Sequence, residues 1–297
     1  MHNELTTKSS LAQQYSQECF DRFMQEGITN NVMRRFQEII QEYYSCNKRT
    51  FAWRTIITPY HVVVSEIMLQ QTQTYRVAPK FDAFIERFPS FAALANASFE
   101  EVLRYWKGLG YNRRAQNLHK IAQIITNNYQ EILPNNPEIL ETFPGIGKAT
   151  AASICAFAYN TPTVFIETNI RTIFIYFFFK NQNQIPDKQI MPLITASLDS
   201  TNPREWYYAL MDYGVMLKKE IGNISQLSKH HTKQTKFIGS NRQVRGKILE
   251  ILLHKKTLAL SELKKLLEFE NSVIEKALNQ LIAEQFVHIV DNDLSLL

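Results

Sequence analysis

The chain has 297 residues, a length that predicts two or three compact units with a substantial hydrophobic core. Hydrophobic residues make up 45% and charged residues 21%, as in an ordinary soluble globular protein. The formal charge of +5 favours a polyanionic partner without establishing one. The polar residues 1–14 lack the apolar stretch of a signal peptide, and the most apolar run, residues 173–179, is too short to span a bilayer. We therefore expect a cytoplasmic, nucleoid-associated protein with no membrane partner.

Helical periodicity is widespread along the chain, and strand patterns are rare. Residues 1–29 form a polar N-terminal extension with helical character. Apolar spacing and Pro or Gly breakers predict further helices at residues 30–44, 60–71, 75–88, 98–106, 113–129, 138–143, 148–159, 168–179 and 203–217. Residues 218–242 are polar and basic, which indicates a linker or a DNA-facing segment.

The C-terminal part of the chain has a different pattern. Three helices are predicted at residues 242–253, 260–267 and 272–284. Two short apolar runs follow, residues 286–290 and 294–297, and the pair Asp291-Asn292 favours a turn between them. Three helices followed by a hairpin predict a small winged-helix-like domain.

Only three cysteines occur, at Cys19, Cys46 and Cys155, far apart in the sequence. Their number and spacing fit no disulfide framework and no metal site, so a reducing compartment is expected. Each is interpreted as a small buried hydrophobic residue.

Two glycines separate predicted helices in the sequence Pro144-Gly145-Ile146-Gly147. Glycine allows positive φ and a close approach of the backbone to a ligand. The amides that open the following helix would then face an anion such as a DNA phosphate. A tight turn between packed helices could also use these glycines for packing alone.

One carboxylate interrupts an apolar helix at Glu66. An unpaired carboxylate is costly in such a place, and a partly dry pocket would raise its pKa toward that of a proton donor. A buried acid satisfied by a partner is the structural alternative. The neighbouring Gln70 and Gln71 can both donate and accept hydrogen bonds, as base reading or a wedge in DNA requires.

Two other sites carry candidate functional groups. Glu167 precedes a predicted helix, where it could face a cationic centre or simply oppose the helix dipole. Tyr111 lies at a turn after Gly108 and Gly110, and Arg113 and Arg114 follow it. An aromatic and arginines at a loop tip suit insertion into DNA and phosphate contact, and a solvated turn is the alternative.

Together these motifs resemble the MutY adenine DNA glycosylases of the endonuclease III superfamily. The match runs from residues 51–54 (FAWR) to 211–214 (MDYG), and in the family's order it includes 65–72 (SEIMLQQT), 108–111 (GLGY), 117–119 (NLH) and 144–150 (PGIGKAT). Residues 237–246 also resemble the tail of some shorter members. The resemblance implies a mainly α, two-lobed helix-hairpin-helix glycosylase fold, here with the winged-helix-like domain at its C-terminus.

The resemblance also implies a mechanism and a set of site residues. The target base is flipped into a cavity between two helical lobes. Glu66 matches the catalytic glutamate that protonates adenine N7 and helps to activate water, and Glu167 matches the second carboxylate, which stabilises an oxocarbenium-like state. The expected substrate- and DNA-binding residues are Trp53, Arg54, Leu69, Gln70, Gln71, Tyr111, Arg113, Arg114, Gly145, Gly147, Lys148, Thr150 and Asn169. Among them, Gln70 and Tyr111 match the wedge that fills the vacated stack.

Three departures from the family pattern matter. The second carboxylate is normally aspartate, and the extra methylene of Glu167 moves the charge by roughly an ångström. Ala149 stands where bifunctional relatives place a Schiff-base lysine, which argues for base removal without lysine-mediated strand cleavage. Residues 215–235 contain no cysteine, so we expect no iron–sulfur cluster and no other cofactor.

The sequence thus predicts a monomeric, monofunctional glycosylase that removes adenine mispaired with G or 8-oxoguanine from duplex DNA. Two alternatives stay open: a mismatch glycosylase for thymine, uracil or another altered base, and a non-catalytic DNA-binding homologue. The small C-terminal domain replaces the Nudix-like domain with which longer relatives read 8-oxoguanine, so the opposite base is open too. The predicted parts are an extension at 1–29, one lobe at 30–58 and 160–225, a second lobe at 59–159, a basic linker at 226–241 and the C-terminal domain at 242–297.

Overall fold

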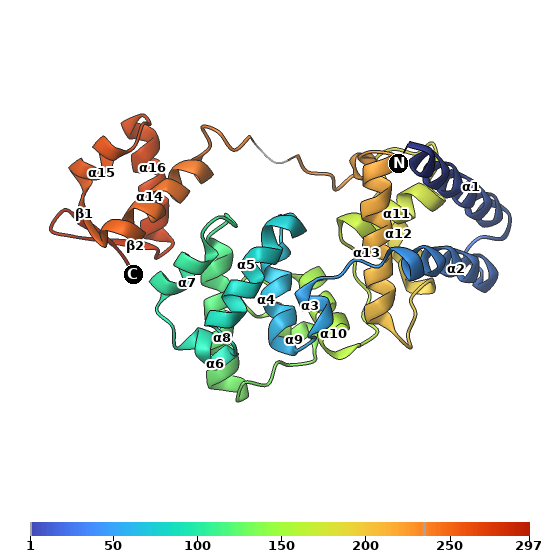
Figure 1. Cartoon of the computed structure of the whole chain (residues 1–297), viewed down its shortest axis with the longest axis horizontal. Helices are drawn as coiled ribbons and strands as arrows, with labels where there is room; N and C mark the ends of the chain where they lie inside the picture. Colours follow the sequence, from blue (N-terminus) through green and yellow to red (C-terminus); the bar gives the residue numbers. More distant parts are fainter. Residues whose placement is uncertain (1, 234–235) are drawn as a thin grey trace. The chain divides into compact units, whose positions relative to one another are not determined.

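The computed structural model describes residues 2–233 and 236–297, and the described residues are mainly helical (Figure 1). They form two compact units. The first comprises residues up to Val62 together with Asn135–Thr142 and Ile146–Thr232. The second comprises Val63–Pro134, Phe143–Gly145 and the chain from Lys233 onward. None of the helices in the described ranges is both long and apolar enough to cross a membrane.

The first unit is built around the apolar helix that the sequence predicted near residues 168–179. Its helices are α1 (His2–Glu26), α2 (Asn30–Asn47), α3 (Ala52–Thr55), the start of α4 (Pro59–Leu69), α9 (Pro137–Glu141), α10 (Lys148–Tyr159), α11 (Thr168–Phe178), α12 (Asp187–Ala196) and α13 (Pro203–Glu220). The fully buried Phe36 ring of α2 meets Phe174, Phe177 and Phe178 of α11 at centroid distances of 5.1–5.2 Å. These aromatic contacts make α11 the centre of the unit's core.

The second unit begins with the rest of α4 and contains α5 (Thr74–Arg87), α6 (Phe91–Ala95), α7 (Phe99–Trp106) and α8 (Arg113–Tyr129). Its C-terminal module consists of α14 (Asn241–Lys255), β1 (Thr257–Ala259), α15 (Leu260–Leu266), α16 (Asn271–Ala283), β2 (Val287–Val290) and β3 (Asp293–Leu296). The antiparallel sheet has the order β1-β3-β2, and Val290 pairs with Asp293 across a two-residue turn. Asp291 and Asn292 both have positive φ there, as a tight hairpin turn requires.

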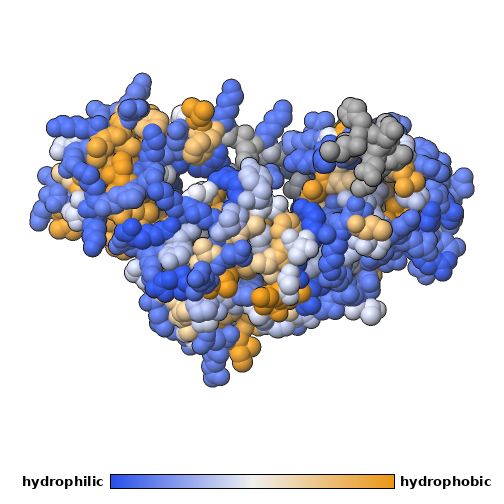
Figure 2. All heavy atoms as spheres, in the orientation of Figure 1, coloured by the Kyte–Doolittle hydropathy of each residue, from blue (hydrophilic) through white to orange (hydrophobic). Residues whose placement is uncertain are grey.

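The C-terminal module packs against α7 and α8 of its own unit. Phe286 is fully buried, and its ring lies 5.5 Å from that of Phe99. Gln116 on α8 donates a hydrogen bond of 3.0 Å to the Glu284 carbonyl, and Arg104 on α7 donates one of 2.6 Å to the Leu253 carbonyl. Apolar burial and these hydrogen bonds hold the module in place. In the space-filling view, hydrophobic side chains gather over this module and in the middle of the visible face, among mostly hydrophilic side chains (Figure 2).

The mainly helical fold and the winged-helix-like C-terminus are as the sequence predicted. Five elements were not predicted: α3, α6, α12, β1 and the 3-10 helix η1 (Ile224–Leu227). Four of them span only three to five residues, too short to show a period, and Pro192 interrupts the pattern of α12.

The compact units differ from the predicted lobes in the placement of α9 and α10, which group with α13 in the first unit. The reason is side-chain packing: Phe157 of α10 stacks on Tyr208 of α13 at 4.9 Å. The polar, basic residues 218–242 are partly structured at their start. There α13 runs to Glu220, and Ile185 exchanges backbone hydrogen bonds of 3.0 Å with Leu227 and Lys229.

Candidate active site and nucleic-acid interface

Glu66 lies in the middle of α4, where Val63, Val64, Ile67 and Met68 are almost fully buried. A helix that is apolar on nearly every side is a buried helix, and Glu66 is its one carboxylate. The side chain is itself half-buried. Because the backbone around it is already paired within the helix, its carboxylate is not needed to form α4.

The predicted wedge glutamines follow at the C-terminal end of α4. Leu69 and Gln70 are half-buried, and Gln71 is exposed with a φ of +56°. A left-handed conformation is costly for a residue with a side chain, and such strain is concentrated at functional sites. Gln70 donates from Nε2 to the Gly145 carbonyl at 3.3 Å, so one glutamine is tied to the hairpin turn while its neighbour faces solvent.

Arg114 holds the end of α4 against the turn that carries Tyr111. Its guanidinium donates to the carbonyls of Ile67 and Met68 at 2.9 and 2.7 Å, to Thr72 Oγ1 at 2.9 Å and to the Gly110 carbonyl at 3.1 Å. The residue is only 8% exposed, and burial lowers its pKa to about 10. These contacts give Arg114 a structural role, because it satisfies helix-terminal carbonyls and supports the turn, while the DNA contact expected of it stays a prediction.

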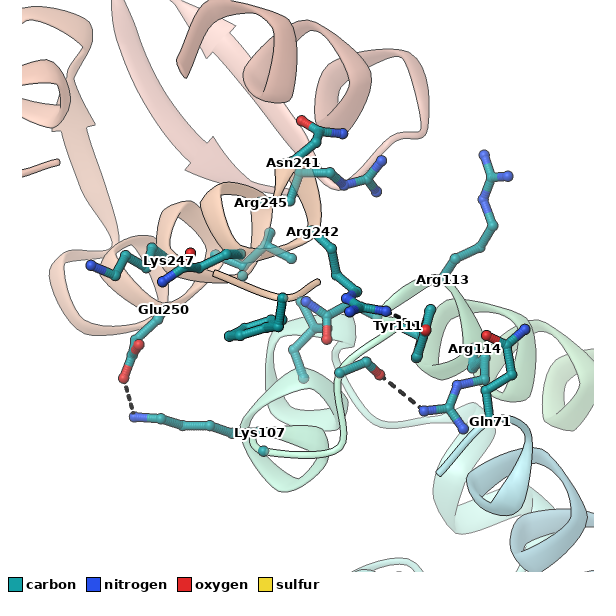
Figure 3. Close-up of a pocket in the computed structure, with 18 of the residues that line it drawn as sticks. Gln71, Lys107, Tyr111, Arg113, Arg114, Asn241, Arg242, Arg245, Lys247 and Glu250 are labelled. Carbon is teal, nitrogen blue, oxygen red and sulfur yellow. Dashed lines mark hydrogen bonds and ion pairs between the residues drawn. The ribbon is translucent and has the colours of Figure 1, made fainter. Parts of the chain in front are cut away.

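The turn at residues 107–112 presents Tyr111. Gly108 and Gly110 have φ of +96° and +72°, and Tyr111 itself has a φ of +49°. Trp106 Nε1 donates to the Gly110 carbonyl at 3.0 Å, and this hydrogen bond fixes the conformation of the turn. Figure 3 shows Tyr111 beside Arg114, with Arg113 extending away from the turn. Tyr111, one of the two expected wedge residues, therefore lies in the left-handed region, as does Gln71, which follows the other expected wedge residue, Gln70.

The hairpin between α9 and α10 uses its two glycines differently. Gly145 has a φ of +77°, and an added Cβ would collide with the side chain of Asn117. Asn117, the asparagine of the NLH motif at residues 117–119, therefore packs closely against the backbone of Gly145. Gly147 has a φ of −100°, which residues other than glycine also adopt. It begins α10 without a capping side chain, and among the described residues no atom other than those of its chain neighbours lies within 4 Å of the position of its missing Cβ.

The space beside Gly147 is open to a ligand. Lys148 is exposed and Thr150 is half-buried in the first turn of α10. Unpaired amides at a helix N-terminus, an exposed cation and a glycine that allows close approach suit a phosphate. These three residues remain predicted DNA contacts.

Glu167 is the N-cap of α11 in the first unit. Its Oε1 accepts hydrogen bonds from the Asn169 and Ile170 amides at 2.8 and 2.9 Å, and its Oε2 accepts one from Asn169 Nδ2 at 3.2 Å. Burial raises the pKa of Glu167, although those amide hydrogen bonds and the charge of Arg171 act in the opposite direction. The carboxylate thus has a structural role as well as a candidate chemical one.

Asn169 is held by a close approach of α13. An added Cβ at Gly214 would lie 2.7 Å from the Asn169 carbonyl oxygen and 2.8 Å from its Cβ. Only glycine fits at this position of the MDYG motif. The motif therefore fixes the start of α11, where Glu167 and Asn169 lie.

The aspartate of the same motif was not predicted as a site residue. Asp212 is 2% exposed and binds Arg54 at 3.0 Å and Arg49 at 2.7 Å. The Arg54 guanidinium also lies 4.3 Å from the Tyr208 ring centroid. Trp53 is buried and stacks on Phe51 at 4.7 Å. The sequence did carry a signal for Asp212, because it is an acidic residue within the apolar stretch of α13.

Cys19 and Cys155 are buried, as predicted, and burial raises the pKa of their thiols to about 12 and about 11. Cys46 is exposed, so the prediction that it is buried was wrong. In the part of the chain that the structure describes, no group of three or more His, Cys, Asp or Glu side chains could hold a metal ion. The segment after α13 is held by the backbone pairing with Ile185 described above.

Residues 64–196 match the model of the HhH-GPD superfamily of base excision DNA repair proteins. The adenine DNA glycosylase of Mycolicibacterium smegmatis is 33% identical over 228 residues, which cover 71% of this chain and 78% of that protein. The chain belongs to the adenine DNA glycosylase family. Another member, from Buchnera aphidicola subsp. Baizongia pistaciae, is 34% identical over 186 residues, and this match spans about half (52%) of its length and 61% of this chain.

Relatives with other names are also similar to this chain. A thymine/uracil-DNA glycosylase of Methanothermobacter thermautotrophicus is 25% identical over 195 residues, which cover 65% of this chain and 88% of that protein. Among solved structures, a thermostable thymine-DNA glycosylase aligns with a TM-score of 0.57 over 66% of this chain and 94% of its own, at 23% identity. Endonuclease III in a non-covalent DNA complex aligns with a TM-score of 0.52 over 62% and 84%, at 13% identity. The structural matches establish the shared fold.

Proposed function

We propose that the protein is a monofunctional DNA glycosylase that hydrolyses the N-glycosidic bond of adenine mispaired with G or 8-oxoguanine. The observation that carries the proposal is the match to the M. smegmatis adenine DNA glycosylase over most of that protein's length. The position of Glu66 in an apolar helix supports it, because a carboxyl in such surroundings suits proton donation. Duplex DNA is the proposed partner, and the protein would act as a cytoplasmic monomer.

In the proposed reaction, the carboxyl of Glu66 donates its proton to N7 of the flipped adenine. The bond between C1′ and N9 then breaks, and its electron pair leaves with the base. The negative charge of Glu167 stabilises the positive charge that develops on the sugar. Water adds to C1′ and loses a proton to the Glu66 carboxylate, which leaves free adenine, an abasic site and a carboxyl ready for another turnover.

The deciding experiment measures base release from labelled duplexes that carry A·8-oxoG, A·G, T·G or U·G. We expect free adenine from the first two, without strand cleavage and without a borohydride-trapped protein–DNA adduct, since Ala149 cannot form a Schiff base. Glu66→Gln should lower release by about 10²–10⁴-fold. Glu86→Gln is the matched control, because Glu86 is an exposed carboxylate on α5. Adenine release that persists at the wild-type rate in Glu66→Gln would contradict the proposed proton donor.

A second candidate, removal of thymine or uracil, is favoured by the match that covers 88% of the Methanothermobacter protein. The T·G and U·G duplexes test it directly. Release of thymine or uracil in place of adenine would mean that the protein hydrolyses the same kind of bond but acts on a different base. A folded protein that binds every duplex and releases no base would identify a non-catalytic homologue.

A further inference from the structure

The third helix of the C-terminal module is poorly suited to reading DNA. In a helix-turn-helix, the second helix of the pair lies in the major groove, and α16 holds that place after α15. Its ionisable residues are one acid and one base, Glu275 and Lys276. Near its C-terminal end, the Glu284 carbonyl accepts from Gln116, and the Glu284 carboxylate binds Arg113 at 3.2 Å and Arg245 at 2.8 Å. The C-terminal end of α16 is therefore already bound by other residues of its own unit.

The hairpin of the module does not compensate for this. Its turn carries Asp291, and Asp293 follows at the start of β3. Beside them, Ile289 and Val290 are 43% and 58% exposed. An acidic, apolar hairpin tip repels phosphates and offers them no cation.

The first helix of the module, α14, has the opposite character. It lies along a pocket of about 800 Å³ whose other wall is the turn that carries Tyr111 (Figure 3). Seven arginine and lysine side chains line this pocket, against two carboxylates, Glu250 and Glu284. Lys107 binds Glu250 at 2.7 Å, and Glu284 binds two arginines, so both acids are neutralised by part of the set. The remaining charge is positive and suits a polyanion.

Arg242 connects α14 with the turn at residues 107–112, which carries Tyr111 and is called the wedge turn below. Its guanidinium donates to the Tyr111 hydroxyl and lies 4.8 Å from the Tyr111 ring centroid and 5.5 Å from that of Phe237. Figure 3 shows the Arg242 side chain extending from α14 toward Tyr111. Arg242 thus brings a cation of the module to the tip expected to enter DNA.

Gly246 gives an independent indication of a ligand. It lies inside α14 and lines the pocket, although glycine in a helix interior is unfavourable compared with alanine. Apart from its chain neighbours and the nearby backbone of α14, no atom of the described residues comes within 4 Å of the position that its Cβ would take. The fold therefore does not require glycine here. A ligand that approaches the backbone of α14 closely does explain it.

We propose that the C-terminal module binds the sugar–phosphate backbone of duplex DNA through the pocket face of α14, and that α16 does not contact DNA. The proposal rests on the proposed function only in taking duplex DNA as the substrate. In this arrangement the module and the wedge turn bind the same stretch of DNA. The cations of α14, with Gly246 at their centre, hold a DNA strand beside Tyr111.

The test inserts single charges at Gly246 in the full chain and measures affinity for an undamaged duplex as a function of salt. We expect Gly246→Glu to weaken binding about tenfold at 50 mM salt, and Gly246→Lys to tighten it and to steepen the slope of log K against log salt by about one. Matched controls are Asn279→Glu and Asn279→Lys at an exposed position of α16, which should leave both quantities unchanged. Gly246→Ala should not lower Tm, since its Cβ meets no atom.

Each other outcome overturns the proposal. Equal affinities for the two Gly246 charge variants would show that α14 faces no phosphate. An effect at Asn279 in place of Gly246 would return α16 to its usual role. A lowered Tm of Gly246→Ala would give the glycine a structural reason. Because the duplex is undamaged, these results are independent of base release: the Gly246 response can hold in a protein that releases no adenine, and can fail in one that does.

Discussion

The two candidate catalytic carboxylates, Glu66 and Glu167, are built into the chain in contrasting ways. Glu66 lies within a helix whose backbone is already paired, so its carboxylate is not needed as a helix cap. Glu167 begins a helix, and three hydrogen bonds from Asn169 and Ile170 depend on its oxygens. The difference shows that a candidate reactive group can lie in a helix interior, where no cap is needed, or can itself be the cap. Substitutions should therefore separate activity from stability at Glu66 and couple them at Glu167.

The largest expected effect is on activity alone. Glu66→Gln should lower single-turnover base release by about 10²–10⁴-fold, the usual contribution of a positioned proton donor, with no loss of Tm. Rapid-quench kinetics and thermal unfolding of the same sample measure both. A melting temperature that falls by several degrees would show that Glu66 also supports α4, and the contrast with Glu167 would fail.

Gly214→Ala tests the support behind Glu167. The new Cβ would lie 2.7 Å from the Asn169 carbonyl oxygen, so α11 and α13 must separate. Overpacking of this kind costs about 1–3 kcal/mol, and the displaced Asn169 should lower base release too. Urea unfolding measures the loss of stability. Gly222→Ala is not a suitable control because its φ is +108°, whereas Gly246→Ala has neither positive φ nor a close neighbour and should not lower stability.

Glu167→Ala should lower both stability and base release. Loss of an N-cap costs about 1 kcal/mol, and the same change removes the charge proposed to stabilise the sugar cation. Glu167→Asp should retain stability, because aspartate is a preferred N-cap residue. If Glu167→Ala unfolds at the wild-type urea concentration, the hydrogen bonds at this helix start contribute nothing measurable, and the two carboxylates are alike in being dispensable.

The smallest expected effect is a pH dependence of stability. Burial raises the pKa of Glu167 above its ordinary value of 4.5, so between 4.5 and the raised pKa the folded state holds a proton that the unfolded state has lost. This contribution favours the folded state at and below pH 4.5 and declines as pH rises through the window. Glu167→Gln has no such proton, so its stability relative to wild type should improve as pH rises. Urea titrations across that range measure this, and a trend of opposite sign would mean that the cap lowers the pKa.

Sequence alone gave good predictions where the signal is local. The helix that carries Glu66 and the one that follows Glu167 show the spacing of apolar residues, and the hairpin at Asp291-Asn292 has the residues its turn requires. Contacts between distant segments left no such signal. Arg114 looked like a DNA contact because its neighbours are basic, and only the folded chain brings its guanidinium to the carbonyls of Ile67 and Met68. The partner of Arg54, Asp212, is 158 residues away and was missed for the same reason.

The buried ring of Phe286 has a consequence for how this chain can be divided. Phe286 contacts Phe99, and Phe99 in turn stacks on His119 at 6.0 Å, so one row of rings joins the C-terminal module to the helices on which it rests. The module is accordingly not a cassette that can be cut off or exchanged at the preceding loop. A shortened chain that ends near residue 240 would expose an aromatic surface to water and invite aggregation. A graft of the module onto another enzyme would have to carry the matching aromatic row with it.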